Sequence, residues 1–420
     1  MPKLSRRTML IGGGTLAVAG IGTMLARPAM GGGMHDPYFS GLAKALREAD
    51  LMRPTLVIDR ARLDANIAAI RKTTDASRLP LRVVAKSLPS PQLLAHVMQG
   101  MGHDRMMVFS AEMLLQLAPL HPRASYLMGK PLPVSEFVRV VEGVGAETAG
   151  RVQWLIDTPL RLREYTAAAR TRSVPLKVSF EIDVGLHRGG FAETAVLADA
   201  ARKAQAEDVS IAGLMGYDPH VPKMPSPDSA YEASQGAYSN AIAALADAGV
   251  VDPRSLTLNA AGSPTFRRHC RGTVANEVSV GSAFVKPGDF DYDELADLTA
   301  AAFIATPVLK RDGDMKLPGI EPLSGPMHWF DRNTERGFFV HGGHWLAQPV
   351  SPPGLQYSSL FGRSSNQELL TGSHRIDLQP GDTVFYRPDQ SEALLLQFGD
   401  IAIYEGGTIS ERWPTLPISA

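Results

Sequence analysis

The sequence has a single cysteine, Cys270, in 420 residues. One thiol excludes a disulfide within the chain, so packing has to stabilise the fold even if the protein is exported. Charge of one sign is also lacking, because 42 Lys and Arg stand against 43 Asp and Glu. No basic stripe with interleaved aromatic residues occurs. We therefore expect a globular protein without a nucleic-acid partner.

The sequence lacks a hydrophobic run typical of a membrane span. Its start, "SRRTMLIGGGTLAVAGIGTMLARPAMGGG", combines an arginine pair (Arg6 and Arg7) with a short, glycine-rich apolar run and small residues. This order is typical of an export signal, and Ser-Arg-Arg points to the twin-arginine route. We predict a twin-arginine signal peptide over residues 1–33, cleaved near Ala29, and a periplasmic protein with no stable span after signal removal. An uncleaved membrane anchor is the alternative.

Eight apolar, β-rich runs alternate with helical patterns in the first two thirds of the chain. They are residues 81–86, 104–110, 124–130, 151–157, 176–183, 209–217, 255–263 and 276–284. Strands that alternate with helices in this way indicate βαβ units and a parallel sheet. Eight runs over roughly 200 residues favour a TIM barrel over an open sheet. We predict an α/β fold with a (β/α)8 barrel over residues 55–298.

The pattern changes after residue 300. Short β-rich runs such as "RGFFVHGGHWLAQPV" and "HRIDLQPGDTVFYRP" are separated by Gly, Pro and Asp turns. This pattern predicts a small, mostly antiparallel β-domain over residues 299–420. Residues 34–54, ahead of the barrel, are a candidate addition to this β-domain.

A lysine stands where burial makes a charge costly. In "LRVVAKSLPSPQLL" an apolar strand is followed directly by Lys86 and then by the start of a helix. Function in a TIM barrel collects at the carboxyl ends of the strands, so this amine is a candidate nucleophile. The alternative is a lysine whose stem covers the core while its head reaches solvent.

Polar residues follow the later strands of the predicted barrel. They are Asp183, Arg188, Tyr217, His220, Asn259, Ser263, Gly281 and Ser282. Glycine and serine after the last two strands suit a phosphate group, because backbone N–H groups can approach it closely. A lysine, an arginine and a phosphate cradle at one barrel mouth indicate a pyridoxal phosphate (PLP) site.

Five of these residues also have a structural alternative. Asp183 and Arg188 are a possible ion pair at a strand–helix turn. Tyr217 is a candidate core residue with its hydroxyl at the rim, and Asn259 a candidate turn residue. His220 follows a proline and is a candidate exposed loop residue.

The segments "TLVIDRARLDANIAAIRK", "RVVAKS" and "EIDVGLHRGGF" resemble the barrel of the alanine racemase-like PLP enzymes of fold type III. The resemblance implies that Lys86 holds PLP, that Arg188 reaches the cofactor, and that both act in catalysis. Tyr217, Asn259, Ser263, Gly281 and Ser282, from their places at the strand ends, are the further candidate cofactor contacts. The later segment "PGDTVFYRPDQSEALLL" is similar to the D-threonine aldolase and D-serine dehydratase branch. We therefore expect a homodimeric, PLP-dependent lyase whose small-molecule substrates are D-3-hydroxy amino acids.

The sequence departs from that branch at its metal ligands. The branch has Pro-x-His-x-Cys or Pro-x-His-x-Asp, whereas this chain has Gln390 and Glu392 at the two positions. An amide oxygen and a carboxylate suit zinc poorly, so no tight zinc site is expected there. A divalent ion bound through Glu392 and a histidine of "VHGGHW", His341 or His344, would resemble magnesium, manganese or calcium. Whether a metal takes part stays open at this point.

Two other functions keep PLP. A racemase needs a base on each face of Cα, and Lys86 could serve with a tyrosine from a partner subunit, Tyr357 or Tyr386. A non-catalytic PLP-carrying homeostasis protein resembles the barrel alone, so the long region after residue 300 argues against it.

Overall fold

The computed structural model describes residues 27–417, apart from residues 317 and 359–360. Most of the predicted signal peptide, with Arg6 and Arg7, lies outside the described residues. Within the described part of the chain, no helix is both long and apolar enough to cross a membrane.

Eight parallel strands close into a barrel, as the sequence predicted. They are β2 (Leu81–Val84), β3 (Arg105–Val108), β4 (Ser125–Met128), β5 (Val152–Ile156), β6 (Lys177–Glu181), β7 (Ser210–Met215), β8 (Thr257–Ala260) and β9 (Glu277–Val280). Each strand pairs with the next, and β9 pairs back onto β2 in parallel register. The strands are almost entirely buried because side chains fill the inside and helices cover the outside. The predicted α/β barrel is confirmed.

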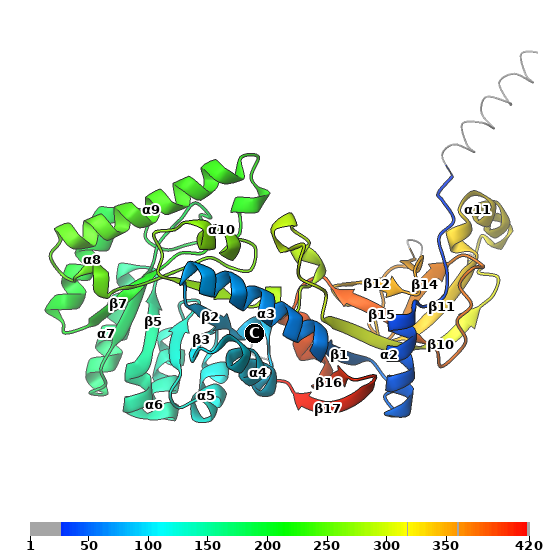
Figure 1. Cartoon of the computed structure of the whole chain (residues 1–420), viewed down its shortest axis with the longest axis horizontal. Coiled ribbons are helices and arrows are strands. Elements are labelled where there is room, and N and C mark those ends of the chain that lie inside the picture. The colour runs from blue at the N-terminus through cyan, green and yellow to red at the C-terminus, as the bar shows by residue number, and fades with distance from the viewer. Residues whose placement is uncertain (1–26, 317, 359–360, 418–420) are drawn as a thin grey trace, which may run out of the picture. The chain divides into compact units, whose positions relative to one another are not determined.

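One helix precedes β2, the others connect successive barrel strands, and all lie on the outside of the barrel (Figure 1). They are α3 (Arg60–Ser77), α4 (Pro91–Met101), α5 (Ala111–Leu120), α6 (Val134–Arg151), α7 (Pro159–Thr171), α8 (Thr194–Ala206), α9 (Pro227–Asp247) and α10 (Phe266–Arg271). Several begin with a side-chain cap close after the preceding strand: Ser90, Ser110 and Thr158 each accept a backbone N–H three residues on. These caps end the strands in short turns, so the residues that follow the strands collect at one mouth of the barrel.

A buried ion pair lies within the barrel. Arg82 on β2 is 1% exposed and Glu277 on β9 is 0% exposed. The Arg82 guanidinium forms two bonds with the Glu277 carboxylate, Nε to Oε1 at 2.7 Å and Nη2 to Oε2 at 3.0 Å. Arg105 Nη1 and Asn259 Nδ2 also donate to Glu277, at 2.6 and 2.8 Å. The carboxylate is therefore fully hydrogen-bonded, which makes its burial tolerable.

The compact units of the chain do not follow the linear boundary drawn at residue 299. The barrel unit comprises residues 55–303 and also residues 387–417, which the sequence pattern places in the terminal β-domain. The reason is long-range pairing: β16 (Asp400–Glu405) pairs in parallel with β1 (Thr55–Asp59), and β17 (Thr408–Pro414) pairs with β16. The short helix α12 (Glu392–Leu395) belongs to the same unit.

Within the described residues, the second unit is mostly antiparallel sheet and comprises residues 27–54 and 304–386. Its strands are β10 (Ala302–Asp312), β11 (Arg336–His341), β12 (Ala347–Ser351), β13 (Gln356–Tyr357), β14 (Gln367–Gly372) and β15 (Thr383–Pro388). They run in the order β13-β14-β11-β10, and β15 pairs with β10 and β12. The unit also holds α2 (Pro37–Glu48) and α11 (Ser324–Phe330), so residues 34–54 lie with the β-domain.

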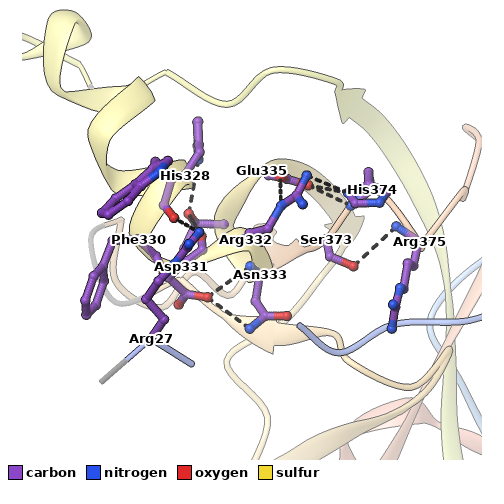
Figure 2. A network of polar contacts seen from close by, with 12 residues as sticks. Arg27, His328, Phe330, Asp331, Arg332, Asn333, Glu335, Ser373, His374 and Arg375 are labelled. Carbon is purple, nitrogen blue, oxygen red and sulfur yellow. Dashed lines mark hydrogen bonds and ion pairs between the residues drawn. The ribbon is translucent and has the colours of Figure 1, made fainter. Parts of the chain in front are cut away.

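The first described residues, 27–33, are hydrogen-bonded to this β-domain, and we call them the N-terminal strap. Their partners Asn333 and Ser373 are labelled in Figure 2. Asn333 accepts a hydrogen bond from Gly31 N at 2.8 Å and donates one to Ala29 O at 2.9 Å. Ser373 Oγ donates to Gly31 O at 2.5 Å. Gly32 has φ +124°, and a Cβ there would lie 2.7 Å from Ser373 Oγ, so only glycine fits. The strap, which we predicted as the end of the signal peptide, is a structural part of the β-domain.

Candidate active site

The carboxyl ends of the barrel strands surround a cavity of about 380 Å³. This volume is in the range of small-molecule sites. The cavity brings together eight of the residues singled out from the sequence: Lys86, Arg188, Tyr217, Asn259, Ser263, Gly281, Ser282 and Glu392. Asp183 and His220 do not line it. His341 and His344 belong to the β-domain unit.

Lys86 is held between a carboxylate and an aromatic ring. It lies in the single turn Ala85–Ser87 that follows β2, and its side chain is 36% exposed. Its Nζ is 3.5 Å from Glu392 Oε1 and 4.8 Å from the ring centroid of Phe109. A carboxylate and a π face are both partners that attract the head of a lysine side chain. The lysine head is thus directed to partners at the cavity.

The loop that carries Glu392 is fixed to the barrel at several points. Ser87 Oγ donates to Glu392 Oε1 at 3.1 Å. Ser391 Oγ lies 2.9 Å from Ser282 Oγ, and Gln390 Nε2 donates to Asp289 Oδ2 at 2.9 Å. These contacts place the Glu392 carboxylate beside Lys86, although the two residues are far apart in the sequence.

Small residues and hydroxyl groups form one end of the cavity. Ser263 Oγ accepts hydrogen bonds from the backbone N–H groups of Gly281 and Ala283, at 3.3 and 3.0 Å. Ser282 Oγ donates to Ser87 Oγ at 3.1 Å. A Cβ at Gly281 would lie 2.8 Å from atoms of Ser87 and Val84, so a larger residue would fill this end. An end with hydroxyls and backbone N–H groups has the chemistry to bind phosphate.

Arg188 contributes a positive charge to the lining of the cavity. Its guanidinium is 5.1 Å from the ring centroid of Tyr217. Burial raises the pKa of Glu181, and the nearby Arg188 charge offsets part of that rise. Burial also raises the pKa of Tyr217 to about 12, with the Glu392 charge adding to the effect. Tyr217 is therefore a neutral hydrogen-bonding group, not a base, at neutral pH.

The structure decides two of the structural alternatives. Asp183 accepts the N–H groups of Gly185 and His187 and bonds the His187 ring at 2.7 Å. Among the described residues Arg188 has no ion-pair partner, so the proposed Asp183–Arg188 pair does not form. Asn259 bonds the side chains of Glu277 and Ser279 instead of satisfying a turn.

Several cavity residues were missed by the sequence analysis. They are chiefly Ser87, Phe109, Lys130, Asp157, Glu181 and Ser279. Phe109, Lys130 and Asp157 follow β3, β4 and β5, so the strand-end rule would have found them if applied to every strand. Glu181 and Ser279 lie within strands, where the sequence carries no signal that separates an inward from an outward polar residue.

The tyrosines considered for racemisation both belong to the β-domain unit. Tyr386 is fully buried within this chain, and burial raises its pKa well above the ordinary value. Tyr357 is partly exposed, its hydroxyl donates to Ala347 O, and the Arg363 guanidinium lies 3.7 Å from its ring centroid. Of the two, Tyr357 is the one with a surface that another molecule can reach.

The family model of the alanine racemase N-terminal domain matches residues 58–287, more than half of the chain. The chain belongs to this family. The family consists of PLP enzymes, so the fold and the cofactor class expected from the resemblance are confirmed at this level. No curated protein sequence matches the chain.

Solved structures of the family share the whole fold at low identity. D-threo-3-hydroxyaspartate dehydratase from Delftia sp. HT23 is similar with a TM-score of 0.69 and 17% identity, covering 87% of this chain and 98% of that one. D-threonine aldolase from Filomicrobium marinum has a TM-score of 0.68 and 19% identity, covering 86% and 94%. Alanine racemase from Bacillus anthracis has a TM-score of 0.64 and 15% identity, covering 86% and 97%. At these identities the likeness establishes the fold.

The cavity residues fit PLP. Lys86 supplies a primary amine for its aldehyde, Ser263, Gly281 and Ser282 supply an end of suitable size and chemistry for its phosphate, and Arg188 supplies a cation near the ring. The fit to a metal is poor. Gln390 is bonded to Asp289, and Glu392 to Lys86 and Ser87. Within the described ranges, no group of three or more His, Cys, Asp or Glu side chains is placed to hold an ion.

Proposed function

We propose that the protein is a PLP-dependent lyase that acts on D-amino acids with a 3-hydroxyl group. The observation that carries this proposal is the pairing of Lys86 with Glu392 at the mouth of a PLP-sized cavity. Aldol cleavage needs a group beside the lysine that takes the proton of the substrate hydroxyl, and dehydration needs one that gives a proton to the leaving hydroxyl; Glu392 is a group that can do either. The similarity of fold to a D-threonine aldolase and to a D-3-hydroxyaspartate dehydratase supports the same reading.

The chain's own residues divide the work. Lys86 would hold the cofactor through its amine. When bound, PLP supplies an acceptor for the electron pair left on Cα. Arg188 and Tyr217 would orient the ring, and the hydroxyl groups of Ser263 and Ser282 would bind the phosphate, with the Ser263 hydroxyl held in place by the Gly281 and Ala283 N–H groups. Lys86 Nζ is the group placed to move a proton at Cα.

A panel of D- and L-amino acids tests this function. The purified protein, loaded with PLP, should absorb at about 420 nm, as expected for PLP joined to an amine. D-Threonine and its 3-hydroxy analogues should yield glycine with an aldehyde, or a keto acid with ammonia, while the L-enantiomers and D-alanine should be inert. Formation of the opposite enantiomer as the sole product would contradict a lyase and establish a racemase.

Racemisation is the second candidate function. The family contains alanine racemases, and Lys86 can serve one face of Cα. The other face would require Tyr357 from the second subunit of a homodimer, since Tyr386 is buried. A non-catalytic PLP-carrying protein is disfavoured because the chain has a whole β-domain beyond the barrel.

We also propose that the protein is exported to the periplasm by the twin-arginine route. The support is the Ser-Arg-Arg start followed by a short apolar run. Replacing Arg6 and Arg7 together with lysine should leave the protein in the cytoplasm, as measured by cell fractionation against a soluble cytoplasmic marker. Unchanged export of this double variant would contradict the proposed route.

A further inference from the structure

The Glu392 carboxylate is shared by two groups of the barrel mouth. Its Oε1 lies 3.5 Å from Lys86 Nζ and accepts a hydrogen bond from Ser87 Oγ at 3.1 Å. Among the described residues Glu392 is the acidic side chain that pairs with Lys86, and its own side chain is 31% exposed. One edge of the carboxylate is therefore engaged, while the group still lines the cavity.

The surroundings of Glu392 disfavour a divalent cation. An ion on Oε1 would lie beside the Lys86 ammonium, and like charges at that separation repel. The neighbouring donor, Gln390, is turned to Asp289, with its amide nitrogen 2.9 Å from Oδ2. A variant of D-threo-3-hydroxyaspartate dehydratase in which a cysteine is replaced by alanine is described in a metal-free form.

We propose that Glu392 takes the place of a metal ion in this enzyme. Its carboxylate positions Lys86 Nζ and takes the proton of the substrate's 3-hydroxyl group as the Cα–Cβ bond breaks and the aldehyde forms; in a dehydration the protonated carboxyl group would instead give a proton to the leaving hydroxide. The reaction then proceeds without a divalent cation. This inference rests on the proposed lyase function. It predicts that PLP and the substrate are sufficient for activity at this site, with no metal ion added.

The first test removes the charge of Glu392 and keeps its shape. Glu392→Gln should still attach PLP through Lys86, seen as the absorbance at about 420 nm. Its kcat on the D-3-hydroxy substrate should fall by about 10²-fold or more, with a smaller change in KM, because the lost contact acts on the reacting hydroxyl. Glu193→Gln, which neutralises an exposed glutamate ahead of α8, is the matched control and should leave both parameters unchanged. An unchanged kcat in Glu392→Gln would overturn the inference.

The second test measures zinc itself. After dialysis against zinc and then buffer, the PLP-loaded protein should retain far less than one zinc per chain, and a chelator should not change its activity. The double variant Gln390→His with Glu392→Cys should gain bound zinc, because imidazole and thiolate are ligands that zinc prefers. Stoichiometric zinc in the unaltered protein, with activity lost to the chelator and restored by zinc, would overturn the inference.

The two proposals fail in different ways. A protein that attaches PLP and binds zinc tightly would keep the lyase function and lose the role given to Glu392. A protein that does not attach PLP at Lys86 would lose the lyase function itself.

Discussion

Replacing Lys86 with alanine is expected to abolish covalent attachment of PLP and to reduce turnover by at least about 10²–10⁴-fold, the usual contribution of a group that moves protons in the reaction. The amine is the one placed between Glu392 and Phe109 at the cavity. The side chain lies in a turn after β2 and not in the packed barrel interior, so the folded state should survive. Borohydride reduction followed by peptide mapping identifies the attached lysine.

The matched control is Lys130→Ala, which removes the other lysine that lines the cavity. This variant should keep PLP attached. If Lys86→Ala retained a reducible adduct while Lys130→Ala lost it, the cofactor lysine would have been assigned to the wrong strand.

Replacing Glu277 with leucine is expected to destabilise the protein by about 3–5 kcal/mol, the usual cost of leaving one member of a buried ion pair without its partner. The substitution leaves Arg82 buried, with its two bonds to the carboxylate removed. Urea unfolding followed by circular dichroism measures the effect. The double variant Arg82→Met with Glu277→Leu should recover much of the loss, because the fully buried guanidinium is then gone. Arg105 also loses its bond to Glu277, but its side chain is 41% exposed and can be solvated. A single-variant loss below about 1 kcal/mol, as for an exposed pair, would contradict this account.

The same pair predicts how the stability of the fold changes at acid pH. Burial acts to raise the pKa of Glu277, but the charge and hydrogen bonds of Arg82 outweigh it, so the folded pKa lies below the ordinary 4.5. A carboxyl group whose pKa is depressed in the folded state stabilises the fold at pH values above its unfolded pKa. This stabilisation is lost as the pH falls through the folded pKa. The stability difference between the unaltered protein and the double variant should therefore shrink below about pH 4.

Position along the barrel strands was enough to predict much of the site. Lys86, Asn259, Ser263 and Gly281 all follow or end an apolar run, and a closed parallel barrel brings such residues to one mouth. The acidic partner of Lys86 could not be predicted in this way. Glu392 follows Ser87 by 305 positions, and nothing local to the loop shows that it folds back onto the barrel.

The barrel's internal ion pair escaped prediction for a related reason. Arg82 and Glu277 are 195 positions apart, and each reads as an ordinary charged residue at the start of an apolar strand. Only the pairing of β2 with β9, which closes the barrel, puts them together. The division into units depended on distance in the same way, because β1 and β16 pair across most of the chain.

The N-terminal strap limits where a leader could be cut from an exported form of the protein. A peptidase takes its substrate as an open, extended stretch whose backbone groups are free to pair with the enzyme. In the folded β-domain the groups needed for this are already occupied: Ala29 O and Gly31 N by Asn333, and Gly31 O by Ser373. Removal of a leader from the folded protein therefore has to occur before Ala29, and only a chain cut before folding could begin later. The first residue of the mature protein would then show whether the chain was cut before or after it folded.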